Sequence, residues 1–259
     1  MAGGKALWVF DFDGTLSVIV PDRDAAQLHP MCRELLNMLA ATPGYFVAVL
    51  SSRSIEDLAS RVPLPGVILG GASGLEWRLP GGHRVHPGDV AENRREKAKE
   101  AISPQLARLS SFPGVDVEDK GWSVAVHYRH VLPEARAMLE PLLSELGRTP
   151  GIRVYRGPSV AEVQLLPHVS KSFGIRRICR FLGVDLSGGR LLYAGDDEND
   201  AVAMRWVLRK GGVALVVGNR MRVPGARCVD SPVELVRVVR ELAAIVPRRH
   251  GGKRGEVVA

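Results

Sequence analysis

The sequence has few cysteines and no long uninterrupted apolar run. Its three cysteines, Cys32, Cys179 and Cys228, are scattered and form no Cys-x-x-Cys pair or Cys/His cluster. This spacing argues against a zinc site or a disulfide framework and fits a reducing compartment. No segment approaches the roughly 20 apolar residues of a membrane helix, and aspartates interrupt the N-terminal apolar run where a signal peptide needs its core. We therefore predict a cytoplasmic protein with no membrane partner.

The basic residues do not form a single block either, although the net charge is +7. The densest basic group lies in a Gly-rich, aperiodic tail at 247–259, which we predict to be disordered. Nucleic-acid binding through this tail is a minor alternative, because a positive net charge suits any anionic partner. With 46% hydrophobic residues, the 259-residue chain can bury a full core.

Short apolar runs alternate with segments whose apolar residues have helical spacing. Such runs are typical of parallel strands buried on both faces, and they lie at 6–10, 46–50, 66–69, 190–194 and 213–218. The resulting β-α-β-α order predicts an α/β fold whose core is a doubly wound, Rossmann-like parallel sheet.

The middle of the chain breaks this pattern. Residues 115–129 and 152–167 each indicate two strands joined by a turn. Helical stretches near 90–110 and 133–148 precede these pairs, and Pro104 predicts a break in the first helix.

These elements predict an inserted α+β cap domain with an antiparallel sheet. We place the cap at 82–167, between a first part of the core at 1–81 and a second part at 168–246.

Alternation along the predicted cap strands separates an apolar face from a polar one. The polar face carries Glu118, His127, Arg129 and Glu162. A solvated sheet face is the plain alternative. The position of this face over a predicted active site favours contact with a substrate instead.

Polar side chains follow the predicted core strands. In an open parallel sheet, ligands bind beyond the carboxyl ends of the strands, so these side chains should converge at one edge. Lys171 opens the helix after the cap and can lie there too. The residues that follow the strands are Asp11, Asp13, Ser51, Ser52, Arg53, Asp196, Asp197 and Asp200.

Together these groups indicate phosphoryl transfer. Hard carboxylate oxygens favour Mg²⁺. One aspartate near the metal can attack phosphorus, and a second, two residues further on, can protonate the leaving alkoxide and then activate water. Lys171 and Ser51 can hold the phosphoryl oxygens. Asp200 either caps the following helix or supports Lys171 or a metal-bound water, and we favour the support.

Four motifs resemble those of the haloacid-dehalogenase-type phosphatases: "DFDGT" from Asp11, Ser51 after a second strand, a lone Lys171, and "GDDEND" from Gly195. They stand in the family's order, and together they are far more specific than any one alone. The segments "EDKGWSVAVHYR" and "AEVQLLPHVSK" further resemble trehalose-6-phosphate phosphatases, and this likeness covers most of residues 6–205.

The resemblance implies roles for individual residues. Asp11 would be the nucleophile and Asp13 the general acid/base, and Asp196 would bind Mg²⁺ together with the Asp11 carboxylate and the Asp13 backbone carbonyl. Ser51, Arg53 and Lys171 would lie on the phosphate side. Asp197, Asn199 and Asp200 would support the site. The positions that match sugar recognition are Glu76, Glu118, Lys120 and Glu162. The implied reaction is Mg²⁺-dependent hydrolysis of trehalose 6-phosphate through an aspartyl-phosphate.

Departures from the family pattern keep other functions open. Ser52 replaces the glycine of Ser-Gly-Arg, Asn199 and Ala201 replace the threonine and glutamate of the last motif, and "GASGLE" from Gly71 lacks the usual histidine. The Asn-Asp form is more typical of phosphatases that act on mannosyl-3-phosphoglycerate or sucrose phosphate. A phosphosugar mutase and a non-enzymatic nucleic-acid-binding protein are the remaining alternatives.

Overall fold

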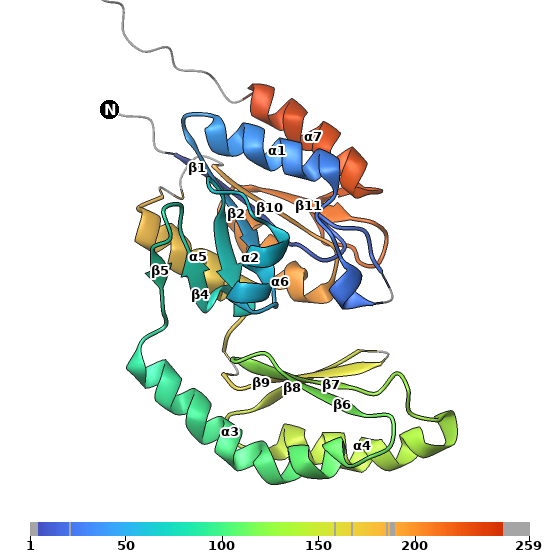
Figure 1. Cartoon of the computed structure of the whole chain (residues 1–259). Coiled ribbons are helices and arrows are strands. Elements are labelled where there is room, and N and C mark those ends of the chain that lie inside the picture. Colours follow the sequence, from blue (N-terminus) through green and yellow to red (C-terminus); the bar gives the residue numbers. More distant parts are fainter. Residues whose placement is uncertain are drawn as a thin grey trace, which may run out of the picture.

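Two β-sheets of different size organise the protein. The computed structural model describes residues 5–20, 22–157, 159–166, 168–184, 186 and 190–245. An eight-stranded sheet forms the core, and a four-stranded sheet with its own helices lies beside it (Figure 1). The tail at 247–259, for which we predict disorder, lies outside the described residues.

The core sheet combines strands from both halves of the chain. Its strands are β1 (Ala6–Phe10), β2 (Tyr45–Leu50), β3 (Ile68–Gly71), β4 (Glu76–Arg78), β5 (Arg84–Val85), β10 (Leu191–Gly195), β11 (Val213–Val217) and β12 (Arg227–Val229). Their order is β12-β11-β10-β1-β2-β3-β4-β5. The strands from β12 to β3 are parallel, and β4 and β5 extend the sheet in antiparallel fashion.

Helices cover both faces of this sheet. They are α1 (Pro30–Ala41), α2 (Ile55–Arg61), α5 (Lys171–Leu182), α6 (Glu198–Arg209) and α7 (Pro232–Ile245). Trp8 and Phe10 pack with α1, α2 and α7, whereas Leu7 and Val9 pack with α5 and α6. Successive side chains of a strand point to opposite faces, so an unbroken apolar strand needs cover on both sides. The predicted doubly wound α/β core is confirmed.

The smaller sheet is antiparallel and carries its helices on one face. Its elements are α3 (Asp89–Ser110), β6 (Asp116–Asp119), β7 (Ser123–His127), α4 (Pro133–Arg148), β8 (Arg153–Arg156) and β9 (Val160–Gln164). The strand order is β6-β7-β9-β8. Val124, Val126 and Val163 pack against α3 and α4 in a separate apolar cluster. The sheet therefore lies between its helices and the core, with its polar face toward the core (Figure 1).

The structure corrects one sequence prediction and bears on another. Pro104 does not break the first helix of the insert, because α3 continues through it. The proline removes one backbone bond to the carbonyl of Glu100, and this residue is exposed, so water can bind the carbonyl instead. The boundaries of the cap at 82 and 167 stay a prediction. However, β5 lies beyond residue 82 and still pairs with β4 in the core sheet.

No described helix crosses a bilayer, since each is too short or too polar for that.

Candidate active site

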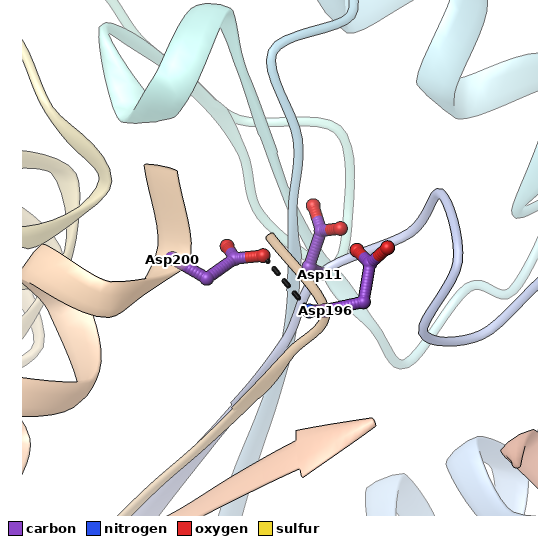
Figure 2. Close-up of side chains that lie close together, drawn as sticks. All are labelled: Asp11, Asp196 and Asp200. Atoms are coloured by element: carbon purple, nitrogen blue, oxygen red, sulfur yellow. Dashed lines mark hydrogen bonds between the residues drawn. The ribbon is translucent and has the colours of Figure 1, made fainter. Parts of the chain in front are cut away.

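Side chains from the ends of neighbouring strands meet at one edge of the core sheet. Asp11 directly follows β1, Asp196 follows β10 and Ser51 follows β2. Because β1 pairs in parallel with both β10 and β2, the carboxyl ends of the three strands lie together. The backbone N–H of Asp11 donates to the carbonyl of Ala194 over 2.9 Å. Figure 2 shows the carboxylates of Asp11 and Asp196 close together, with Asp200 beside them.

A tight turn after β1 brings Asp196 against the backbone. Gly14 has a φ of +78°, in the left-handed region that favours glycine. A Cβ atom at this position would lie 2.2 Å from Oδ2 of Asp196. A side chain at position 14 would therefore displace the Asp196 carboxylate, which explains why the run of apolar residues ends in a turn at glycine.

Lys171 is buried between two carboxylates. Its Nζ atom donates to Oδ1 of Asp11 and to Oδ1 of Asp200, each over 2.6 Å. Burial lowers the pKa of Lys171, but the two carboxylates outweigh burial and raise this pKa well above its usual value. The start of α5 comes this close because Gly174 contacts Gly74, where a Cβ would lie 2.4 Å from the Gly174 Cα.

Asp200 uses both of its carboxylate oxygens inside the protein. Its Oδ1 accepts from Lys171 and, over 2.5 Å, from the hydroxyl of Tyr193. Its Oδ2 accepts from the backbone N–H groups of Asp196 and Asp197 over 3.1 and 3.3 Å. Asp197 in turn caps α6 by accepting from the backbone N–H of Asn199 and of Asp200. Asp200 therefore has the contacts of a residue that supports Lys171.

The chain offers oxygen donors that fit a hard divalent cation. Asp11, Asp196 and Asp200 can bring one carboxylate oxygen each to within 4.8 Å of the others. Since the oxygens of Asp200 are already engaged, Asp11 and Asp196 are the better donors. Burial and the neighbouring carboxylates raise the pKa of Asp196 to about 7, and burial above all raises that of Asp11 well above its usual value. A cation bound here would offset this cost, and all-oxygen donors suit Mg²⁺.

This raised pKa predicts how the stability of the metal-free protein depends on pH. Below about pH 4, Asp196 is protonated in both the folded and the unfolded chain. As the pH rises toward about 7, the unfolded chain loses this proton while the folded chain keeps it, so folding becomes less favourable. We expect the wild type to lose stability relative to Asp196→Asn over this range. Urea denaturation at several pH values measures the difference, and a difference that is independent of pH would contradict the prediction.

Asp13 lies next to Asp11 in sequence but belongs to a different set of contacts. Its carboxylate accepts from Nε and Nη2 of Arg53 over 2.8 and 2.7 Å. Nη1 of Arg53 donates to Asp57 over 2.7 Å. Arg53 is only 1% exposed. The hydroxyl of Ser51 accepts from the backbone N–H of Arg53 over 3.2 Å, so the loop after β2 holds both residues beside the site.

The polar face of the smaller sheet contains two pairs of predicted substrate-binding residues. Lys120 donates to Oε2 of Glu162 over 2.6 Å, and the hydroxyl of Ser123 donates to the other oxygen of Glu162. His127 and Glu118 lie 2.9 Å apart through Nε2 and Oε2. Glu118, His127 and Glu162 thus lie in strands whose alternation predicts one shared face, and Lys120 reaches that face from the turn after β6.

Two other residues of the insert lie outside these pairs. Arg129 is exposed and lies in the turn after β7, so it is not part of the sheet face to which its alternation assigned it. Trp122 connects the insert to the core, because its indole Nε1 donates to Oε1 of Glu76 over 2.8 Å. Trp122 also packs with Ala72 and Leu75 of the core.

Sequence reasoning missed several contacts of the site. Tyr193 gives no signal in the sequence, because it reads as a core aromatic residue inside a strand. Asp57 gives a weak one, since it stands four residues after Arg53 at the first turn of a helix, where side chains can meet. Trp122 stands in the sequence among alternating apolar residues, which predicts packing inside the insert and gives no sign of a contact with the core.

The sequence matches a known protein family over most of its length. The model of the family described as trehalose-phosphatase matches residues 9–226. The chain belongs to the trehalose-phosphatase family. The match begins inside β1 and ends next to β12, so it includes both parts of the core sheet and the insert between them.

Curated relatives in the trehalose-phosphatase family come from mycobacteria. A protein named trehalose-phosphate phosphatase in Mycobacterium tuberculosis is 35% identical over 242 residues, which are 90% of this chain and 60% of that protein. A protein of the same name in Mycobacterium leprae is 32% identical over 249 residues, which are 90% of this chain and 56% of that protein. The chain thus spans a little over half the length of these relatives.

Solved structures share the fold of this trehalose-phosphatase family member. The C-terminal domain of Candida albicans trehalose-6-phosphate phosphatase has a TM-score of 0.73 at 20% identity and covers 94% of this chain and 93% of its own. The Aspergillus fumigatus trehalose-6-phosphate phosphatase has a TM-score of 0.64 at 24% identity, with 93% of both chains covered.

Proposed function

We propose that this chain hydrolyses trehalose 6-phosphate to trehalose and phosphate in a Mg²⁺-dependent reaction. The observation that carries the proposal is the buried Lys171 between Asp11 and Asp200, next to Asp196, in a chain of the trehalose-phosphatase family. A buried lysine between carboxylates at the end of a parallel sheet gives a fixed positive charge where phosphoryl oxygens would lie.

The proposed chemistry proceeds in two displacements at phosphorus. The carboxylate of Asp11 attacks phosphorus and forms an aspartyl-phosphate, while the bond to the sugar oxygen breaks and Asp13 gives that oxygen its proton. Water then attacks the phosphorus of the aspartyl-phosphate, and Asp13 takes up the proton of the water as the bond to Asp11 breaks. Phosphate and the free carboxylate of Asp11 result.

Other residues of the chain hold the phosphoryl group during these steps. Lys171 offsets the negative charge of the phosphoryl oxygens, and the hydroxyl of Ser51 helps to orient them by donating a hydrogen bond. Asp200 and Tyr193 keep Lys171 in place. Asp11 and Asp196, with the backbone carbonyl of Asp13, would hold Mg²⁺, which supplies charge neutralisation for the phosphoryl oxygens.

The polar face of the insert is proposed to bind the sugar. Sugar hydroxyls need hydrogen-bond partners of both kinds, and this face offers side-chain nitrogens beside carboxylate acceptors. Because the face lies toward the core in the structure, it can reach a substrate whose phosphate is at Asp11 (Figure 1). On this face the residues proposed for sugar binding are Glu118, Lys120, His127 and Glu162. Glu76 of the core strand β4 and Arg129 in the turn after β7 are proposed for the same role.

The experiment that tests the function is phosphate release by the purified protein. The substrates are trehalose 6-phosphate, glucose 6-phosphate, sucrose 6-phosphate and mannosyl-3-phosphoglycerate, each with Mg²⁺ and with EDTA. We expect a strong preference for trehalose 6-phosphate, loss of turnover with EDTA and recovery when Mg²⁺ is added in excess. If the protein hydrolyses only one of the other esters, the proposed reaction would stand, but trehalose 6-phosphate would not be its substrate. Activity that persists in EDTA would contradict the proposed dependence on Mg²⁺.

Asn199 and Ala201 favour a different phosphosugar as the second candidate substrate, since these positions depart from the family's usual residues. An isomerised phosphosugar without free phosphate would instead identify a mutase. If none of the esters reacts, nucleic-acid binding can be measured instead. Binding that weakens with salt and is lost on removal of residues 247–259 would support the hypothesis of a non-enzymatic nucleic-acid-binding protein.

A further inference from the structure

Glu76 lies at the same edge of the core sheet as the candidate active site. It is the first residue of β4, and it pairs with Gly71 at the carboxyl end of the parallel strand β3. The backbone N–H of Ser51 donates to the carbonyl of Gly70 over 2.9 Å, so the end of β3 lies beside the loop that carries Ser51. The register of β4 therefore places Glu76 where a ligand of the sheet edge can meet it.

One carboxylate oxygen of Glu76 is held and the other is open. The indole Nε1 of Trp122 donates to Oε1 over 2.8 Å, whereas no group within the described ranges donates to Oε2. Glu76 is only partly buried, so Oε2 can accept from the hydroxyl of a sugar. Glu162 differs, because Lys120 and Ser123 already bind both of its oxygens.

Trp122 is itself held tightly by its surroundings. Its side chain is buried and packs with Ala72 and Leu75 of the core. The guanidinium carbon of Arg95, on helix α3 of the insert, lies 4.7 Å from the centre of the ring. The packing of the ring thus sets the direction in which its N–H points.

The turn that carries Trp122 is fixed within the insert. Oδ1 of Asp119 accepts from the backbone N–H of Gly121 over 2.8 Å, and Gly121 has a φ of +83°, in the region that favours glycine. Nζ of Lys99 on α3 donates to both oxygens of Asp119 over 2.7 and 3.0 Å. Trp122 therefore belongs to an ordered turn of the insert, whereas its acceptor Glu76 belongs to the core sheet.

We propose that Trp122 is a positioning residue for sugar recognition: its indole holds Glu76 so that Oε2 of Glu76 accepts from a hydroxyl of the sugar. The proposal rests on the proposed function, since it needs a sugar phosphate whose phosphoryl group lies at Asp11. The core supplies the carboxylate and the insert supplies the group that orients it. Recognition of the sugar by Glu76 therefore depends on contact between the insert and the core.

The choice of acceptor distinguishes this role from packing alone. A buried indole N–H needs an acceptor, and a backbone carbonyl is sufficient. Trp77 shows this arrangement in the same chain, because its Nε1 donates to the carbonyl of Gly74 over 2.8 Å. Trp122 instead binds a carboxylate that lies at the edge of the sheet, and a hydrogen bond to a carboxylate is stronger than one between neutral groups.

The variant Trp122→Phe tests the proposal, because it removes the N–H and keeps an aromatic ring in the same packing. We expect kcat/KM for trehalose 6-phosphate to fall about tenfold, since Glu76 loses the contact that orients it. The inhibition constant of orthovanadate, which resembles the phosphoryl group and carries no sugar, should stay within a factor of about two. Both quantities are measured from trehalose release with Mg²⁺. The matched control is Trp206→Phe in the second half of α6, which should leave both unchanged.

A double-mutant cycle tests whether Trp122 acts through Glu76. Glu76→Ala alone should lower kcat/KM for trehalose 6-phosphate at least as much as Trp122→Phe, because it removes the acceptor itself. In the Glu76→Ala background, Trp122→Phe should lower kcat/KM no further. Glu76→Ala leaves the packing of the indole in place, so it tests the proposal even if Trp122→Phe does not fold.

Three results would overturn the proposal: orthovanadate inhibition that weakens in parallel with kcat/KM in Trp122→Phe, additive effects in the Glu76→Ala background, or an unchanged kcat/KM in Trp122→Phe or in Glu76→Ala. Failure of the underlying function gives a different result. In that case the wild type itself releases no trehalose from trehalose 6-phosphate.

Discussion

Replacement of Asp11 by asparagine is expected to lower kcat for trehalose 6-phosphate by about 10⁴-fold or more. The amide cannot form the aspartyl-phosphate, and two neighbouring carboxylates are held by other contacts: Asp13 is bound by Arg53, and Asp200 has both oxygens engaged. Asparagine has nearly the same shape, so the core around β1 should be retained. Phosphate release and the melting temperature, measured on the same preparation, check both parts of the expectation.

The folded state of Asp11→Asn should be about as stable as the wild type. The substitution removes one carboxylate contact of Lys171, but it also removes a buried charge near Asp196 and Asp200, two carboxylates that raise the pKa of Asp11. Asp230→Asn, at an exposed position before α7, is the matched control and should keep full activity. Full turnover by Asp11→Asn would contradict the proposed aspartyl-phosphate at Asp11. An unfolded Asp11→Asn protein would contradict the expectation that its stability equals that of the wild type.

Lys171→Met is expected to affect both activity and stability. The loss of the buried ammonium should lower kcat by about 10² to 10³, because phosphoryl oxygens lose a fixed positive charge. It also leaves Asp11 and Asp200 without their shared partner in a buried site, which should cost about 3 kcal/mol of folding free energy. Steady-state kinetics and urea denaturation measure these two effects.

A second substitution separates the two roles of Lys171. Lys171→Met combined with Asp200→Asn removes one of the unpaired carboxylates, so part of the lost stability should return. Activity should not return, since Asp200→Asn restores no charge next to the phosphoryl group. If the double variant regains activity together with stability, then Lys171 acts only on the fold.

The long apolar strands could be predicted because burial on both faces leaves a clear pattern. β1, β2, β10 and β11 all lie where their apolar runs predict them, within one or two residues. β5 and β12 escaped prediction because they are short, and β12 begins with exposed residues. Their place in the sheet depends on pairing with a neighbour, and such pairing leaves little trace in a segment of two or three residues.

In the candidate site, too, some residues could be placed from the sequence and others could not. Asp11, Ser51 and Asp196 could be placed together because each directly follows a parallel strand. The environment of Arg53 could not, since it depends on how α2 turns Asp57 back toward the loop after β2. The contact between Trp122 and Glu76 could not be predicted either, because it depends on how the insert packs on the core.

An alternating pattern in the sequence also does not show at which residue a strand ends. Arg129 follows the alternation of β7 in the sequence, yet the strand ends at His127 and the chain enters a turn. Pro104 is the opposite case, since a residue that usually ends a helix is tolerated on the surface of α3.

The sheet order has a consequence for how the protein is made. Phe10 pairs with Ala194, so the strand that carries Asp11 gains its second neighbour only after the insert and β10 have left the ribosome. Until then β1 has an open edge in the growing chain, which is prone to unwanted pairing. Contacts this far apart in sequence form slowly. Asp11 and Asp196 therefore come together only after β10 has been synthesised, and a chain that ends before β10 cannot assemble this pair of carboxylates.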